Sequence, residues 1–184
     1  SYCQVPGCVQ HDDGNCAAFL RREFGNTLCS DGKYLYVAQE DDSHKLCWYR
    51  YEIGQGTGQG EAAAEIAELP EVMDCSMESV YHDGYVFFIL GVSDGSGEWN
   101  YALYRQRLSE KPGKAKEIYR AEPGTFLENI SLCGDRIYLS QWNPEGGELI
   151  SLDENGKDRR TVLEDTFITS YVLEKEKIWY SCGE

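Results

Sequence analysis

The 184-residue chain carries 17 Lys and Arg against 32 Asp and Glu, which gives a formal net charge of −15 at pH 7. This charge repels phosphate backbones and anionic lipid surfaces, so the sequence argues against nucleic acid and membrane partners. The length suits one domain with its own hydrophobic core, and the absence of a long apolar run argues against membrane insertion.

The first predicted elements are two strands, residues 2–10 and 16–24, on either side of the turn at 11–15. The next unit, 29–68, begins with the turn Asp31-Gly32 and the strand 34–36. A second strand at 46–51 and the Gly-rich turn 54–60 follow. Residues 61–69 are rich in Ala and Glu, but their place in the unit predicts a fourth strand and not a helix.

The same order of turns and strands recurs in 76–121 and 129–165, and its first half recurs in 169–184. Gly32, Gly84, Asp135 and Glu176 occupy equivalent positions, at intervals of 52, 51 and 41 residues. Four short strands at this spacing are typical of β-propeller blades. Strands that are apolar on both faces, such as 87–90, cannot be buried by one sheet and must stack on neighbours.

We therefore predict an all-β fold, a β-propeller of four-stranded antiparallel blades in a single domain, 1–184. A β-sandwich is the competing fold. The blades are 29–68, 76–121, 129–165 and a fourth built from 169–184 with 1–28. Either the two termini meet in this fourth blade and close a small ring, or the chain is part of a larger propeller. In the second case other blades complete the ring, including those of a second copy in a homodimer.

Eight cysteines are spread along the chain without closely spaced pairs, which disfavours a structural zinc site. Closure of the ring would place Cys182 beside Cys3, and Cys8 and Cys16 flank the first turn, so both pairs are candidate disulfides. Disulfides imply an oxidising setting, and we expect an extracellular or cell-surface location. Buried free thiols are the alternative.

The sequence predicts no catalytic residue, metal or cofactor. Its three histidines, His11, His44 and His82, lie in predicted loops, and no nucleophile motif is present. The Gly-rich segment 54–60 joins two strands and lacks the Lys of a phosphate loop. Acidic turns such as 12–15 are explained by the backbone geometry of tight hairpins, and none matches a calcium loop.

Aromatic residues are the remaining candidates for ligand contact. Trp142 and Trp99 are predicted in hairpin loops, where they could stack on sugars or anchor a protein partner. Buried packing is predicted for Trp48 and Trp179.

Several short motifs carry a resemblance to a known family. Leu103-Tyr104-Arg105, its echo Trp48-Tyr49-Arg50, and Asn155-Gly156-Lys157 leading into Val162-Leu163 resemble the repeats of secreted bacterial TolB-like propellers, including Gram-positive cell-surface types. The similarity covers about residues 26–184. It implies binding or scaffolding at the cell envelope and assigns no site residue. The cysteines and the amino-terminal stretch depart from that pattern.

We therefore expect a non-enzymatic extracytoplasmic propeller that binds a protein or a glycan. The alternative is a carbohydrate-active hydrolase or lyase, with acidic residues converging on the central funnel. Three or more carboxylates or histidines around a deep central pocket would favour the enzyme. A purely structural fragment is a third possibility.

Overall fold

The computed structural model describes residues 28–41, 43, 45–54, 60–68, 74–93, 97–108, 112–164, 167–174 and 177–183. Within these ranges the chain forms strands and turns, with no helix. The strands make three four-stranded sheets and one two-stranded sheet, all antiparallel.

Blade 1 consists of β1 (Leu28–Ser30), β2 (Tyr34–Glu40), β3 (Lys45–Glu52) and β4 (Glu61–Glu68). Blade 2 consists of β5 (Asp74–His82), β6 (Tyr85–Ser93), β7 (Trp99–Arg107) and β8 (Lys116–Arg120). Blade 3 consists of β9 (Phe126–Cys133), β10 (Arg136–Asn143), β11 (Gly146–Asp153) and β12 (Arg160–Leu163). Half-blade 4 consists of β13 (Ile168–Glu174) and β14 (Lys177–Cys182). The strand prediction for 61–69 is confirmed by β4.

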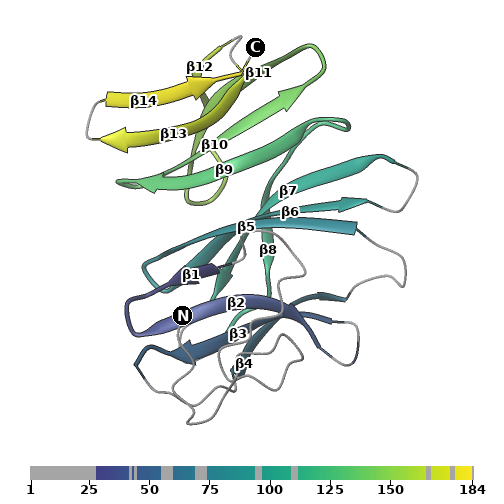
Figure 1. Ribbon diagram of the computed structural model, residues 1–184, viewed down its shortest axis with the longest axis vertical. Coiled ribbons are helices and arrows are strands. Elements are labelled where there is room, and N and C mark those ends of the chain that lie inside the picture. The colour runs from purple at the N-terminus through teal and green to yellow at the C-terminus, as the bar shows by residue number, and fades with distance from the viewer. Residues whose placement is uncertain are drawn as a thin grey trace, which may run out of the picture.

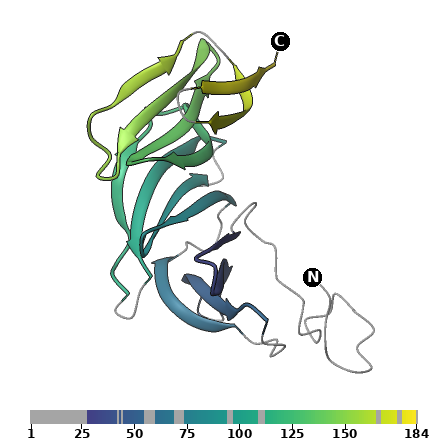
Figure 2. The same cartoon turned by 90° about the vertical axis from the view of Figure 1, so that its left-hand side faces the viewer.

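Within each sheet the strands follow one another in sequence order. Figure 1 shows the sheets stacked along the long axis of the molecule, and Figure 2 shows that they follow a curved arc. This radial stacking of four-stranded meanders confirms the predicted propeller architecture. The contribution of residues 1–27 to a fourth blade lies outside the described residues and stays a prediction.

The recurring turn has a local cause that blade 1 shows clearly. The Oδ1 atom of Asp31 accepts hydrogen bonds from the backbone N–H groups of Lys33 (2.8 Å) and Tyr34 (2.6 Å). Gly32 takes φ +88°, a conformation that costs a residue with a side chain about 1 kcal/mol or more. The Asp-Gly pair therefore closes the β1–β2 hairpin and sets the register of both strands.

Two hydrophobic cores lie between neighbouring blades, and strand β6 contributes to both. Val86, Phe88 and Leu90 pack with residues of blade 1, including the fully buried Trp48. Phe87 and Ile89, on the opposite face of the same strand, pack with residues of blade 3. Side chains of a strand alternate between its faces, so the continuous apolar run of β6 is explained by burial on both sides.

Polar contacts also join the blades. The buried amide of Gln106 in β7 donates from Nε2 to the carbonyl oxygens of Glu65 in β4 (2.7 Å) and Gly113 (3.0 Å). Arg105 reaches from β7 to the β11–β12 turn, where it donates to the carbonyl oxygen of Glu154 (3.3 Å) and to Oδ1 of Asn155 (3.2 Å). Blade 2 is therefore fixed to blade 1 and to blade 3 by both apolar and polar groups.

Half-blade 4 differs from the others in its exposure. The side chains of Val172, Trp179 and Tyr180 are 64%, 61% and 48% exposed. The prediction that Trp179 is buried is therefore wrong in the described part of the chain, whereas the prediction for Trp48 is confirmed, with 0% exposure. Trp179 is exposed because β14 pairs only with β13 among the described strands, so it has no neighbour on its other side.

Candidate functional site

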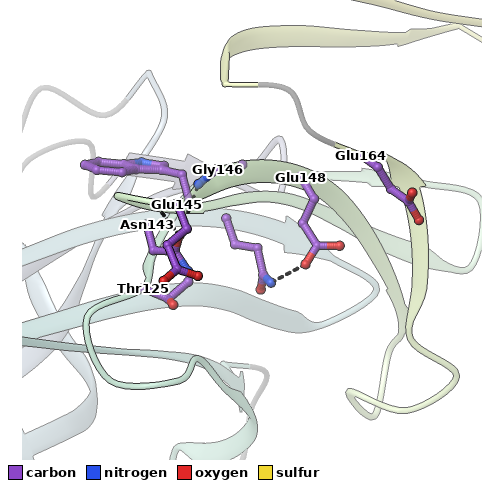
Figure 3. A pocket seen from close by; sticks show the side chains of 9 residues that line it. Thr125, Asn143, Glu145, Gly146, Glu148 and Glu164 are labelled. Carbon is purple, nitrogen blue, oxygen red and sulfur yellow. Dashed lines mark hydrogen bonds between the residues drawn. The ribbon is translucent and has the colours of Figure 1, made fainter.

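A surface cleft of about 310 Å³ lies at the β10–β11 hairpin of blade 3. Its lining residues come from this hairpin, from the turn before β9 and from the end of β12, and they are Thr125, Gln141, Trp142, Asn143, Glu145, Gly146, Gly147, Glu148 and Glu164. Figure 3 shows Asn143, Glu145 and Thr125 close together at one end, Glu148 in the middle and Glu164 at the other end. We call this region the hairpin cleft.

The hairpin turn is held by Asn143, whose Oδ1 accepts hydrogen bonds from the backbone N–H groups of Glu145 (2.9 Å) and Gly146 (3.2 Å). Gly146 is exposed, and a Cβ atom built on it would meet nothing within 4 Å. Gly146 therefore adds no side chain at this edge of the cleft, and the space beside its Cα is open.

Trp142 forms one wall of the cleft and belongs to a row of aromatic rings. Its indole stacks on Phe126, with ring centroids 4.1 Å apart, and lies 5.1 Å from Phe167. The row continues through Tyr101, whose ring is 5.2 Å from that of Phe126, to Trp99, which stacks on Tyr101 at 5.8 Å. This aromatic row links blade 2, blade 3 and the segment that enters half-blade 4.

The structure corrects the predicted location of both tryptophans. Trp142 lies in β10 and Trp99 begins β7, where the sequence predicted hairpin loops. The strand pairing is direct, since Trp142 pairs with Gly147 and Trp99 with Ser93. Both side chains pack within the aromatic row, so a contact between either ring and a ligand stays a prediction.

The floor of the cleft is a hydrogen-bonded network around Glu148. Its Oε1 accepts hydrogen bonds from Nε2 of Gln141 (2.6 Å) and from Arg159 (2.5 Å), and its Oε2 accepts one from the hydroxyl of Thr161 (2.9 Å). The Oε1 atom of Gln141 in turn accepts a hydrogen bond from the hydroxyl of Tyr119 (2.8 Å). These contacts hold the floor side chains in fixed orientations, while Glu145 and Glu164 are exposed at the two ends.

A second cavity, of about 320 Å³, lies where the innermost strands of all four units approach one another. Its lining residues are Leu28 of β1, Glu78 and Ser79 of β5, Asn129, Ile130 and Ser131 of β9, and Ser170 and Tyr171 of β13. This position corresponds to the central axis of the propeller, and we call it the axial cavity.

The axial cavity contains one carboxylate among the described residues that line it, Glu78. Burial raises the pKa of Glu78, although hydrogen bonds from the backbone N–H groups of Ile130 (3.1 Å) and Asn129 act in the opposite direction. Opposite it, Ser131 donates a hydrogen bond to the Tyr171 hydroxyl (2.9 Å), which donates to the carbonyl oxygen of Asn129.

Sequence reasoning did not single out Glu78. One sequence feature could have identified it: Glu78 is a charged residue in the middle of strand 74–82, which is the first strand of its repeat. The enzyme alternative predicts several acidic residues at the axis, and the described lining offers a single carboxylate held by backbone groups.

The predicted disulfides are not tested by the described residues. Cys29, Cys47, Cys133 and Cys182 carry free thiols, buried for the first two and exposed for Cys182. Cys3, Cys8 and Cys16 lie outside the described residues, so both proposed pairs stay predictions. Among the residues that the structure describes, no group of three or more His, Cys, Asp or Glu side chains could hold a metal ion. The described part of the chain also has no helix of the length and apolarity that a membrane span requires.

No protein-family model matches the chain, and no curated protein matches it. Among solved structures, it is similar to oligopeptidase B from Leishmania major, with a TM-score of 0.50 and 11% sequence identity over 84% of this chain. A chain from a structural and mechanistic analysis of two prolyl endopeptidases is 13% identical over 82% of this chain, with a TM-score of 0.36. The chain spans 23% and 30% of the lengths of these two proteins.

These peptidases contain β-propeller domains, and the similarity to oligopeptidase B concerns the fold alone. Together with the arc of four-stranded meanders, it shows that this chain is a β-propeller.

Proposed function

We propose that this chain is a non-catalytic binding propeller that recognises a glycan or a protein outside the cytoplasm, at the cell envelope, through the hairpin cleft. The observation that carries the proposal is a cleft whose lining is rich in hydrogen-bond acceptors and rests on a rigid aromatic row. The resemblance to secreted TolB-like repeats supports the extracytoplasmic setting.

The lining favours neutral or cationic ligand groups. Carboxylate oxygens accept hydrogen bonds from sugar hydroxyls, from ammonium groups and from guanidinium groups. Three carboxylates, Glu145, Glu148 and Glu164, line the cleft, and Arg159 forms an ion pair with Glu148. With the strongly negative net charge of the chain, this arrangement disfavours anionic sugars and acidic peptides.

The hydrogen bonds of Glu148 support binding over catalysis. A general acid or base must exchange a proton with its substrate. Both oxygens of Glu148 already accept hydrogen bonds from Gln141, Arg159 and Thr161, so this carboxylate serves to order the floor. Preorganised acceptors of this kind lower the entropy cost of fixing a polar ligand.

The test is a calorimetric titration of the chain with neutral, amino and acidic oligosaccharides and with Lys-rich peptides. Glu164→Gln removes an exposed lining charge, and Gln141→Ala removes a floor amide. Asp135→Asn is the matched control, because Asp135 is exposed at the β9–β10 turn, at the other end of the same blade.

We expect a neutral or amino oligosaccharide, or a cationic peptide, to bind. The combined cleft substitutions should weaken that binding about tenfold, which corresponds to about 1.4 kcal/mol. The control should bind as the unsubstituted chain does. A preference for acidic ligands, or equal affinity in all variants, would overturn the proposed site. Release of shortened oligosaccharides in mass spectra would instead support the carbohydrate-active alternative.

A further inference from the structure

We propose that the axial cavity is a second binding site, which holds a primary ammonium group against the carboxylate of Glu78. Either a small alkylamine or the lysine side chain of a polypeptide carries such a group. The proposal is independent of the function of the hairpin cleft, because the two sites share no described lining residue.

A β-bulge in β9 fixes the position of the Glu78 carboxylate. In the pairing of β9 with β10 the register shifts between Tyr138 and Ser140, so that Asn129 and Ile130 both lie opposite a single residue of β10. Asn129 takes φ +57°, in the left-handed region. Consecutive N–H groups of a regular strand point to opposite edges, whereas both of these N–H groups donate to Glu78. The bulge therefore turns two backbone donors of blade 3 towards one carboxylate of blade 2.

The negative charge of Glu78 has no basic side chain beside it in the described lining of the cavity, which contains no Lys, Arg or His. A carboxylate has about four acceptor positions, and the two backbone N–H groups occupy two of them. Burial and the nearby charge of Glu128 raise the pKa of Glu78, so the ionised form is only partly compensated. A bound ammonium group would supply both a positive charge and further hydrogen-bond donors.

The hydroxyl groups beside Glu78 are arranged to accept hydrogen bonds from a ligand. The Tyr171 hydroxyl donates its proton to the carbonyl oxygen of Asn129, so it accepts the proton of Ser131, whose Oγ lies 2.9 Å away. Both hydroxyl protons are thus used, and the remaining lone pairs of Ser131 Oγ can only accept. An ammonium group matches this arrangement, because it has three donors and no acceptor.

The rest of the lining indicates the size and class of the ligand. The volume of about 320 Å³ is near the lower end of the range for small-molecule sites, roughly 300–1,000 Å³. Leu28 and Ile130 offer apolar side chains to a short alkyl chain. The buried hydroxyl of Ser79 has no oxygen or nitrogen partner among the described residues. Calcium takes six to eight oxygen ligands, several of them carboxylates, and the described lining supplies one carboxylate.

The test is an NMR titration of the isotope-labelled full chain with n-butylammonium at neutral pH, with n-butanol as the uncharged control of similar size. An acetylated and amidated lysine presents the same group on a peptide backbone. Glu78→Gln removes the charge but keeps a carbonyl oxygen for the two backbone N–H groups. Glu174→Gln is the matched control, because Glu174 is an exposed carboxylate of β13 outside the described cavity lining.

We expect n-butylammonium, and not n-butanol, to shift the backbone amide signals of Ile130 and Ser131. Glu78→Gln should weaken this binding at least about tenfold, whereas Glu174→Gln should leave it unchanged. Binding of either ammonium compound supports the site: n-butylammonium alone points to a free amine, and the lysine derivative to a polypeptide. Equal binding of n-butanol, or equal weakening by both substitutions, would overturn the proposal. Signals that shift only at Gly146 and Gly147 would do so too, but would leave the hairpin cleft as a binding site.

A pH titration of the unsubstituted chain provides a readout that does not depend on the folding of a variant. Only the ionised carboxylate attracts an ammonium group, so binding should weaken as pH falls through the pKa of Glu78. By the same linkage the bound amine should lower that pKa, which the signal of the Glu78 carboxyl carbon measures. Glu128 of β9 and Tyr171 of β13 are the other titratable groups that act on Glu78 or are acted on by it. A Glu78 pKa that the amine leaves unchanged would overturn the proposal.

Discussion

At the scale of single residues, Gly156 shows how a turn of one blade is fitted against its neighbour. This glycine has φ +76° in the β11–β12 turn, and a Cβ atom added to it would lie 1.9 Å from the carbonyl oxygen of Ile118 in β8. Gly124 has nearly the same φ, +77°, but its Cβ would meet nothing within 4 Å. Substitutions at these two glycines therefore distinguish the free-energy cost of backbone strain, which both share, from the cost of a steric clash, which only Gly156 has.

We expect Gly124→Ala to lower the free energy of unfolding by about 1 kcal/mol, the cost of a side chain in the left-handed region. Gly156→Ala should cost about 3 kcal/mol or more, because the blade interface must also move apart to admit the methyl group. Urea denaturation of both variants measures the difference. Equal shifts of the two midpoints would mean that the turn of blade 3 is not packed on β8.

At the scale of secondary-structure elements, Arg105 joins strand β7 to the β11–β12 turn. Besides its two hydrogen bonds, its guanidinium lies 3.8 Å from the centroid of the Tyr85 ring and forms an ion pair with Glu154 at 3.5 Å. The Arg105 side chain is 19% exposed, so solvent screens these contacts only in part. A planar guanidinium can stack on the ring and donate in several directions at once, which an ammonium group cannot do.

Arg105→Lys should therefore lower the free energy of unfolding by about 1–2 kcal/mol. Arg107→Lys, two residues further along the same strand, is the matched control because Arg107 is exposed, and its cost should stay within about 0.5 kcal/mol. Thermal and urea unfolding of the two variants provide the measurement. If both cost the same, the contact between blades contributes little to stability.

At the scale of the whole molecule, buried thiol and phenol groups make the free energy of unfolding depend on pH in the alkaline range. Burial raises the pKa of the Cys29 thiol from 9.0 to about 12. Burial likewise raises the pKa of Tyr36, whose hydroxyl also donates to Asp31, and the pKa of Tyr171. The unfolded chain therefore releases these protons at lower pH than the folded chain does. Since the unfolded state then binds fewer protons, the free energy of unfolding falls as pH rises above about 9.

Cys29→Ala should reduce this fall by up to about 1.4 kcal/mol per pH unit between the thiol pKa values of the two states. Urea unfolding in reductant from pH 8 to pH 11 provides the slope. Cys182→Ala is the control, because it removes an exposed thiol. A slope that Cys29→Ala leaves unchanged would show that the thiol is not shielded in the folded chain.

The strands could be predicted because the features that form them are local. Asp31-Gly32 and Asp83-Gly84 close hairpins by turn chemistry, and the two-sided apolar pattern of 85–90 requires burial on both faces. The roles of the tryptophans could not be predicted in this way. Trp142 is followed by turn residues and Trp99 is preceded by them. Both nevertheless extend a strand, because their rings stack on other aromatic rings, that of Phe126 for Trp142 and that of Tyr101 for Trp99.

The candidate sites depended on contacts that the sequence does not contain. Trp142 drew attention to the hairpin cleft, but the floor residues Gln141 and Glu148 become neighbours only through the pairing of β10 with β11. Glu78 reaches the axis because the first strand of each blade lies innermost, which depends on the curvature of the whole arc. Local patterns thus identify the blades, and the geometry between blades decides which side chains meet.

The two faces of β6 belong to two different cores, so the stack of blades has a direction. Val86 and Phe88 face blade 1, while Phe87 and Ile89 face blade 3, so the two surfaces of blade 2 are not interchangeable. A blade turned over would present the wrong surface to both neighbours. Tandem duplication of blade-sized segments preserves the orientation automatically, because every copy enters the stack facing the same way. Such a head-to-tail series has no internal stopping point, so its length is limited either by a capping unit or by a curvature that returns it to its own first member.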